Sequence, residues 1–329
     1  MRRQVLRLVG ATAALLALLL GTSLAGVASA ASADGGPGTA VNPADARAVA
    51  KSAGFRAAAG VGHAAVTWQS GSIAVGGSEY WTWHNAPANA IFEVSLAPHD
   101  VEQHHTCFLR VARTWYVKTP VGERQFRIQL TNPANQLQAC QGKVLLNWVV
   151  PGTSWSSGTL NPGASTTATW KHANPAKVYV VGLNPGKVST ANCAFELTSA
   201  SYIRVNSTEK QFTFTVKNIG SVACSAGVQL AWLDSILIPV SEKFNPQTMH
   251  PNAEGSVGWS KYPLSTDAVY VPGLSLTRID TSAPCKMKML THDFYAFLYA
   301  DGSTNGWLRV DVKNTGSTDC QPLLHLAKM

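Results

Sequence analysis

Three segments of this chain repeat one pattern, and this repetition constrains the fold more than any other feature. Each copy is an alternating apolar and polar run that ends in Asn, at 125–132, 211–218 and 306–314. One cysteine precedes each run and one follows it, which uses all six cysteines of the chain. A repeat of this kind predicts a single β unit that is stapled by one disulfide and copied along the chain. The repetition pairs the cysteines as Cys107–Cys140, Cys193–Cys224 and Cys285–Cys320.

A second repeated element begins with a tryptophan and continues into an apolar strand. Its copies start at Trp83, Trp170 and Trp259, which lie 87 and 89 positions apart. A side chain that recurs at the same place in every copy is most simply a core residue, so we expect these rings to be buried. From about residue 63 onward the strands are short and alternate with period two, and no convincing helical period occurs. The sequence therefore predicts an all-β protein with units of about 90 residues.

The runs that end in Val-Lys-Asn, at 216–218 and 312–314, resemble strands of the tandem immunoglobulin-like sandwiches of secreted bacterial surface and adaptor proteins. The resemblance covers most of residues 63–329. It implies about three Ig-like β-sandwich units, each with about seven short strands and one disulfide. The cysteines depart from the antibody pattern, because Cys193 and Cys224 flank the Phe212 strand. The resemblance therefore implies a fold and an extracellular setting, and nothing finer about function.

The N-terminal part of the chain differs in composition from the rest. Residues 1–30 combine a basic start, an apolar run and an Ala28-Ser29-Ala30 site, which predicts a secretory signal peptide. An uncleaved membrane anchor is the alternative. Residues 31–62 are rich in Ala, Gly, Ser and Pro, which predicts a flexible tail. This tail could be a spacer, or a docking peptide with Phe55 as its anchor.

The remaining boundaries follow from placing the cysteine element before the tryptophan element. This order gives a first half-unit at 63–98, Ig-like units at 99–187 and 188–275, and a C-terminal half-unit at 276–329. Each half-unit alone would expose an apolar face and open sheet edges. We expect the two halves to pair within one chain, because linkage raises their effective concentration. Pairing between chains, or with a partner's strand, is the alternative.

The charge pattern and the candidate ligands argue against several function classes. The net charge is +8 but charged residues are only 13% of the chain and do not cluster, so nucleic-acid binding is not expected. The densest ligand cluster is His99, Asp100, His104 and His105, a weak metal site at most, because neighbouring histidines of a strand point to opposite faces. The mature part has no G-x-S-x-G motif. We expect no enzymatic activity and no cofactor, with a secreted hydrolase as a remote alternative.

The function that these features favour is protein binding outside the cell. We predict a secreted adaptor or scaffold protein, such as a subunit of a toxin-like multi-protein particle, with no membrane association after signal cleavage. The expected docking residues are Phe55, Leu323, Leu324 and Leu326. The alternative is a carbohydrate- or cell-wall-binding module. It would use Trp81 and Trp155, which do not recur in the copies and are therefore expected to lie on the surface, where rings can stack on sugars.

Overall fold

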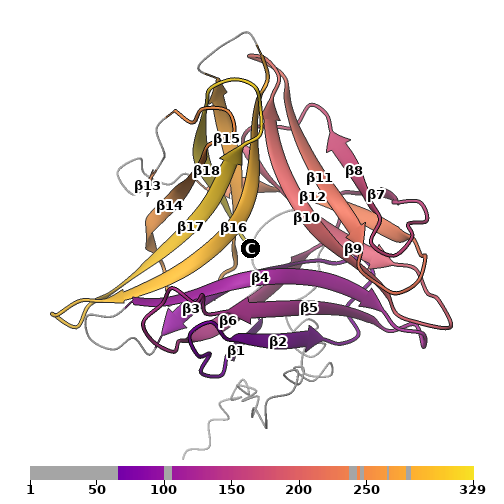
Figure 1. The fold of residues 1–329 in the computed structure, drawn as a ribbon, viewed down its shortest axis with the longest axis horizontal. Coiled ribbons are helices and arrows are strands. Elements are labelled where there is room, and N and C mark those ends of the chain that lie inside the picture. Colours follow the sequence, from indigo (N-terminus) through magenta and orange to yellow (C-terminus); the bar gives the residue numbers. More distant parts are fainter. Residues whose placement is uncertain (1–65, 100–105, 237–242, 245–247, 265–266, 279–282) are drawn as a thin grey trace, which may run out of the picture.

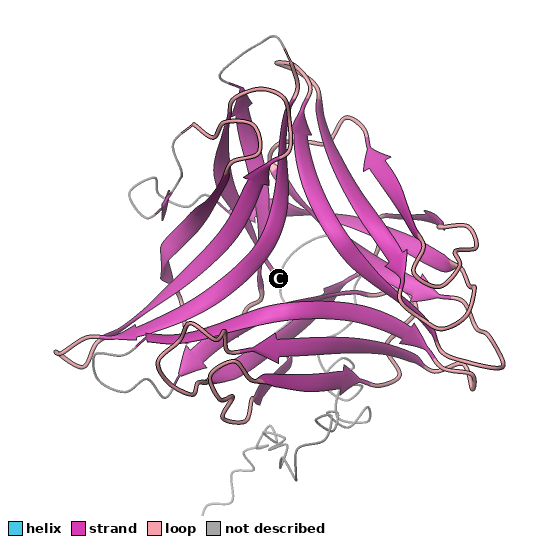
Figure 2. Ribbon diagram, viewed as in Figure 1, coloured by secondary structure: helices cyan, strands magenta, loops and turns pink. Residues whose placement is uncertain are grey.

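The computed structural model describes residues 66–99, 106–236, 243–244, 248–264, 267–278 and 283–329 (Figure 1). These residues form β-strands and loops only, as predicted (Figure 2). Within them no helix is long and apolar enough to span a membrane. The strands are β1 (Val66–Gln69), β2 (Ser78–Trp83), β3 (Ile91–His99), β4 (Thr106–Lys118), β5 (Arg124–Thr131), β6 (Gln141–Val149), β7 (Thr153–Ser156), β8 (Ser165–Trp170), β9 (Lys177–Pro185), β10 (Cys193–Arg204), β11 (Lys210–Asn218), β12 (Ala226–Ile236), β13 (Lys243–Phe244), β14 (Glu254–Tyr262), β15 (Tyr270–Arg278), β16 (Cys285–Leu298), β17 (Thr304–Asn314) and β18 (Cys320–Lys328).

The strand pairings divide these strands into three sets. Set 1 (β1–β6) has the layers β1–β6–β3 and β2–β5–β4. Set 2 (β7–β12) repeats this scheme with β7–β12–β9 and β8–β11–β10. Set 3 (β13–β18) pairs β15 with β18, and joins β13, β14, β17 and β16 in its other layer. The two layers of a set pack through apolar side chains, as where the rings of Phe92 and Phe126 stack 5.1 Å apart.

This grouping differs from the predicted boundaries and corrects them. The predicted half-unit 63–98 contains β1, β2 and β3, which pair with β5 and β6 directly after it, and not with the C-terminal strands. Likewise β8, placed in the unit 99–187, pairs with β11 of the next unit. Each set therefore starts with the tryptophan element and ends with the cysteine element. A repetition fixes the length of a unit but not the residue at which it starts. Strands that follow one another closely pair with the smallest loss of chain entropy, which favours the boundaries that the structure shows.

The three sets are joined by β4, β10 and β16, which form a closed triangle (Figure 1). The second half of each strand pairs with the first half of the next: β4 with β10, β10 with β16, and β16 with β4. Near its middle each strand has an irregularity in register, after Val111, Leu197 and Met289. Between the paired halves, the inner edges of the three strands have no partner among the described strands. The triangle therefore leaves an opening at its centre.

A compact apolar cluster lies around the centre of the molecule and draws on all three sets. It includes Ile91 of β3, Val178 and Val180 of β9, and Val271 of β15, each at most 5% exposed. Gly182 allows the sets to approach, because a Cβ there would lie 2.8 Å from the Ile91 side chain. The chain ends beside this cluster, where the Met329 and Val269 backbones exchange two hydrogen bonds. In Figure 1 the C-terminus accordingly lies at the centre.

Two of the predicted disulfides, Cys193–Cys224 and Cys285–Cys320, are present. They are consistent with an extracellular location. Cys107 and Cys140 are both buried, and the structure does not join them by a disulfide bond. Their side chains are hydrogen-bonded, and this contact lowers the pKa of the Cys140 thiol. The second cysteine of every set forms the same type of backbone bridge, Cys140 with Ile73, Cys224 with Leu160 and Cys320 with Met249.

We expect Cys107 and Cys140 to form a third disulfide in protein folded under oxidising conditions. They occupy the positions of the two bonded pairs, and closing a loop of this length stabilises a fold by roughly 3–4 kcal/mol. Mass spectrometry of the unreduced, denatured protein tests this, with alkylation before proteolysis. A peptide pair linked through Cys107 and Cys140 is the expected result. Alkylation of both cysteines without prior reduction would contradict it.

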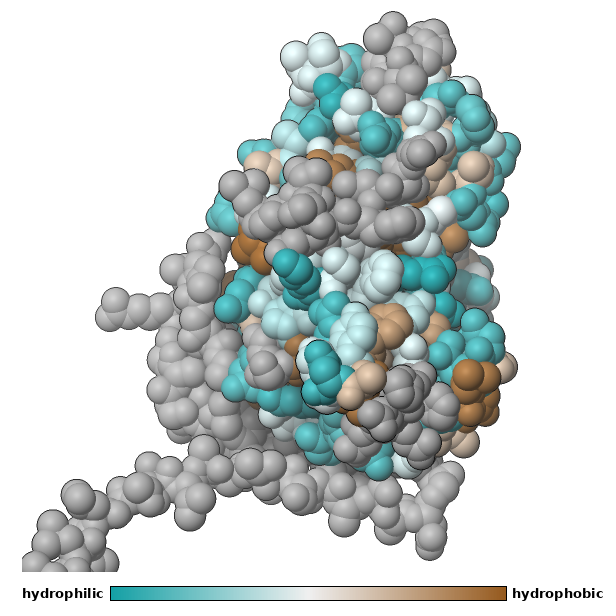
Figure 3. Space-filling view, turned by 90° about the vertical axis from the view of Figure 1, so that its left-hand side faces the viewer, coloured by the Kyte–Doolittle hydropathy of each residue, from teal (hydrophilic) through white to brown (hydrophobic). Residues whose placement is uncertain are grey.

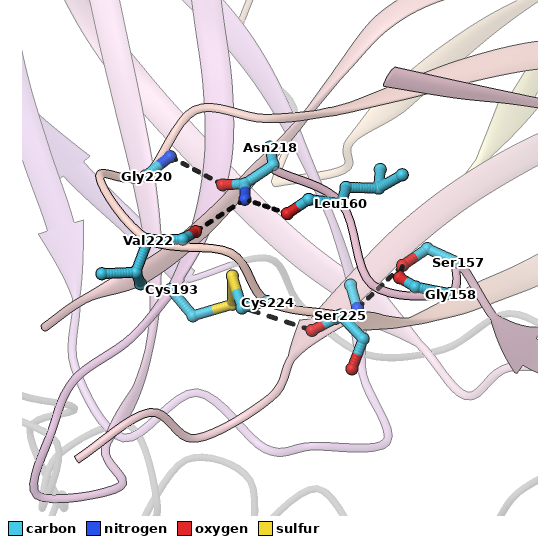
Figure 4. Close-up of a disulfide and its surroundings, with 10 residues drawn as sticks. Ser157, Gly158, Leu160, Cys193, Asn218, Gly220, Val222, Cys224 and Ser225 are labelled. Atoms are coloured by element: carbon cyan, nitrogen blue, oxygen red, sulfur yellow. Dashed lines mark hydrogen bonds between the residues drawn. A yellow bond between two sulfur atoms is a disulfide. The ribbon is translucent and has the colours of Figure 1, made fainter. Parts of the chain in front are cut away.

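A buried asparagine closes the same corner in every set, next to the cysteines. Asn218 donates from Nδ2 to the carbonyl oxygens of Leu160 and Val222, both at 2.8 Å, and the Gly220 N–H donates to its Oδ1 at 2.9 Å (Figure 4). Asn132 and Asn314 make the same pair of Nδ2 hydrogen bonds to backbone carbonyls. All three residues are 0% exposed. The Asn that ends each repeated run is therefore a structural clamp.

Replacing Asn218 by alanine is expected to lower the free energy of unfolding by about 2–3 kcal/mol, because the Val222 carbonyl would lose its donor and the Leu160 carbonyl would keep only the Cys224 N–H. Asn206→Ala is the matched control, since Asn206 is exposed and caps a turn at the surface. It should cost less than about 1 kcal/mol. Urea unfolding of both variants measures the difference. Equal losses in the free energy of unfolding would show that the buried Asn218 stabilises the fold no more than an exposed turn residue does.

Candidate functional site

The predicted C-terminal docking residues are mostly inside the protein. Leu324 and Leu326 are 1% and 0% exposed, and Leu323 is half-buried. They lie on β18, which pairs with β15 along its length and with β12 at its end. The prediction that Leu324 and Leu326 bind a partner is therefore wrong, because set 3 is complete and covers them itself. Phe55 lies outside the described residues.

The predicted surface tryptophans are also largely part of the core. Trp81 is 5% exposed and its ring lies 5.4 Å from that of Trp68, so its assignment as a glycan-stacking ring is wrong. Of the three recurring tryptophans, Trp83 is buried as predicted, whereas Trp170 and Trp259 are only half-buried. Period-two alternation puts the rings of Trp81 and Trp83 on the same side of β2. Trp155 is half-buried and its ring packs 5.9 Å from Phe214. It faces β12 at the position where Trp68 faces β6.

The most exposed tryptophan is one that the sequence did not single out. Trp232 on β12 is 37% exposed and its ring stacks on Trp170, with centroids 5.9 Å apart and planes at 22°. Figure 3 shows a different face, the left-hand side of Figure 1, on which hydrophobic residues are scattered in small groups among hydrophilic ones. The stacked rings of Trp232 and Trp170 form a local aromatic feature at the surface of set 2.

The suggested metal cluster is described only in part. His99 ends β3, and its Nε2 atom lies 2.5 Å from Oε1 of Gln69. Asp100, His104 and His105 lie outside the described residues. Among the residues that the structure describes, no group of three or more His, Cys, Asp and Glu side chains could hold a metal ion.

The edge strand β8 is open to pairing on one side. It pairs with β11 and with no other described strand, and it lies on the outside of the triangle (Figure 1). Its exposed side chains include Thr167 and Thr169, whose hydroxyls hydrogen-bond to Thr215 and Thr213 of β11 at 2.9 and 3.1 Å. Residues 165–170 contain no charged residue and no proline, and the pairing has no bulge. Charges, prolines and bulges are the usual protection of free edges, and β8 has none of them.

A cavity of about 230 Å³ lies where the three sets meet. Its walls come from β3, β9 and β15 and from the irregular middle parts of β4, β10 and β16. The rings of Phe92, Tyr116, Tyr179 and Tyr202 line it together with aliphatic side chains and with polar ones such as Thr198. Because every set supplies part of the wall, the cavity exists only in the closed triangle.

Glu93 is the one carboxylic acid that lines this cavity. It follows Phe92 on β3, just as Val180 follows Tyr179 on β9 and Val271 follows Tyr270 on β15, so the other two sets have valine at its position. Its carboxyl group makes no hydrogen bond to a described residue. Burial raises its pKa to about 8, because the charged form loses its hydration. At neutral pH Glu93 is therefore mainly a neutral acid that can donate a hydrogen bond.

The other ionisable groups of the cavity are Tyr179 of β9, whose pKa is raised by burial, and residues of β4, β10 and β16. Tyr116 and Tyr202 have pKa values raised by burial, and the charge of Glu93 raises them further. His292 has its pKa lowered by burial, so its imidazole is held neutral. Arg113 is exposed at the surface end of the lining and is ion-paired with Glu196 of β10. The cavity thus combines neutral polar groups with one outer cation.

Comparison of the chain with protein-family models gives no match, and comparisons with curated proteins and with solved structures give none either. Function is therefore inferred from the geometry of the chain itself.

Proposed function

We propose that this protein is a secreted, non-catalytic adaptor built of three Ig-like β-sandwich units, and that it binds an extracellular protein by strand addition at β8. The observation that carries the proposal is the unprotected edge of β8, because an extended segment of a partner can complete such an edge through main-chain hydrogen bonds. The adaptor could be a subunit of a secreted multi-protein particle. The rigid triangle would hold this edge at a fixed place relative to the other two sets.

The test is to purify the protein from its own culture supernatant and to measure the mass of its complex by size-exclusion chromatography with light scattering. Thr169→Lys adds a charge to the free edge, whereas Thr213→Lys adds the same charge one strand away from it. The proposal expects a stoichiometric complex that Thr169→Lys abolishes and Thr213→Lys retains. A protein that elutes alone, or a complex that tolerates both variants equally, would overturn it.

Carbohydrate binding is the second candidate, and the stacked pair of Trp232 and Trp170 favours it. An exposed indole face can stack on a sugar ring. Retention on chitin, cellulose or peptidoglycan that is lost in Trp232→Ala, and kept in the edge variant Thr169→Lys, would support this function instead of the adaptor.

A further inference from the structure

The central cavity differs from an ordinary packing defect in its position between the three sets and in its volume. It lies at the junction of the three sets, below the part of the triangle where β4, β10 and β16 are unpaired on their inner edges. Each of these three strands has its register irregularity next to the cavity, at the point where it passes from one neighbouring strand to the next. Its volume of about 230 Å³ exceeds the cavity of about 150 Å³ that is known to hold benzene in an engineered protein. A substituted aromatic ring would fit.

The position of Glu93 supplies a second, independent observation. A valine at this position, as in sets 2 and 3, packs in the central apolar cluster. Glu93 is half-buried, and its carboxyl group lines the cavity without a hydrogen bond to a described residue, so it lowers stability to the extent that its charged form loses hydration. The walls of the cavity combine aromatic and aliphatic side chains with hydroxyl groups, and convergent apolar and polar groups of this kind are characteristic of small-molecule sites.

We propose that the central cavity binds a small uncharged organic molecule, whose apolar body packs against the aromatic lining while a carbonyl or ether oxygen accepts a hydrogen bond from the Glu93 carboxyl. This site is independent of the adaptor function. It is also distinct from the edge of β8, which lies on the outside of the triangle.

The charges around the cavity favour a neutral ligand over a charged one. A cation would require Glu93 to ionise where its charged form loses hydration, and the only charged group that the lining offers beside it is the guanidinium of Arg113. An anion would find no charged partner inside, because His292 is held neutral and Glu93 cannot pair with it. A neutral acceptor requires neither the ionisation of Glu93 nor the protonation of His292. The protonated carboxyl of Glu93 can donate a hydrogen bond to it directly.

Ligand-observed saturation-transfer NMR on the full chain can test the proposal with three probes of similar size: acetophenone, ethylbenzene and benzylammonium. At pH 6 we expect acetophenone to bind roughly tenfold more tightly than ethylbenzene, as one hydrogen bond allows. Benzylammonium should bind least. The preference for the ketone should decline as the pH rises through about 8, where Glu93 ionises.

Glu93→Val, which restores the residue type of the other sets, should abolish the preference for acetophenone and keep the binding of ethylbenzene. Glu254→Val is the control, because Glu254 is an exposed residue of β14, and it should change neither. Retained ethylbenzene binding shows that Glu93→Val is folded with its cavity intact. The proposal is overturned if the wild type binds neither acetophenone nor ethylbenzene, if it prefers benzylammonium, or if Glu93→Val keeps the preference for the ketone.

Discussion

Glu93→Val is expected to become more stable than the wild-type protein as the pH rises, by roughly 3–5 kcal/mol between pH 4.5 and pH 8. Glu93 has a pKa of about 8 in the folded protein, against an ordinary value of 4.5. Between these values the unfolded chain has lost the proton that the folded protein still holds. The folded wild-type protein is therefore destabilised progressively as the pH increases, and the loss is complete above about pH 8. Valine removes this penalty.

Guanidinium unfolding of both proteins at pH 4, 6 and 8.5 measures the effect. The difference between the two proteins is the informative quantity, since His292 and the tyrosines Tyr116 and Tyr202 line the same cavity and their titration is common to both. His292 acts in the opposite direction, because its lowered pKa makes the folded state lose stability as the pH falls below its ordinary range. A difference that stays constant from pH 4 to pH 8.5 would show that Glu93 is solvated.

Arg110→Met is expected to lower the free energy of unfolding by about 3–5 kcal/mol, because it leaves a buried carboxylate without its partner. Arg110 of β4 donates from Nε and Nη2 to the two carboxylate oxygens of Asp293 on β16, at 2.6 and 2.9 Å. Asp293 is 1% exposed, whereas Arg110 is 29% exposed. This bidentate pair joins set 1 to set 3, at the point where the triangle closes.

The double variant Arg110→Met/Asp293→Leu should recover most of the lost stability, because replacing a buried ion pair by apolar side chains is often close to neutral. Lys313→Ala is the control, since it breaks an ion pair with Glu254 at the surface and should cost less than about 1 kcal/mol. Urea unfolding of the wild type, the single variants Arg110→Met and Asp293→Leu and the double variant gives the coupling energy. If the two single substitutions are additive, the pair does not hold the sets together.

The repeated cysteines and the period-two alternation were enough to predict the all-β structure and two disulfides, because both depend on local sequence. The start of each unit was not predictable in this way. Trp81 could have been placed correctly from Trp83, since residues two apart on a strand share a face. The chemistry of Glu93 could have been noticed by aligning Phe92-Glu93-Val94 with Tyr179-Val180-Val181. The cavity itself could not, because it needs three sets whose mutual pairing no local pattern encodes.

The ring formed by β4, β10 and β16 has a consequence for dissecting this molecule. Each of these strands shares its hydrogen bonds between two different neighbours, so removing any one set strips backbone partners from both of the others. Truncation at the boundaries of the sets would therefore yield fragments with newly bared strands prone to self-association, unlike the independent beads of an open array. The smallest fragment worth expressing is therefore the one that contains all three sets. Point substitutions are the appropriate way to assign roles to its parts.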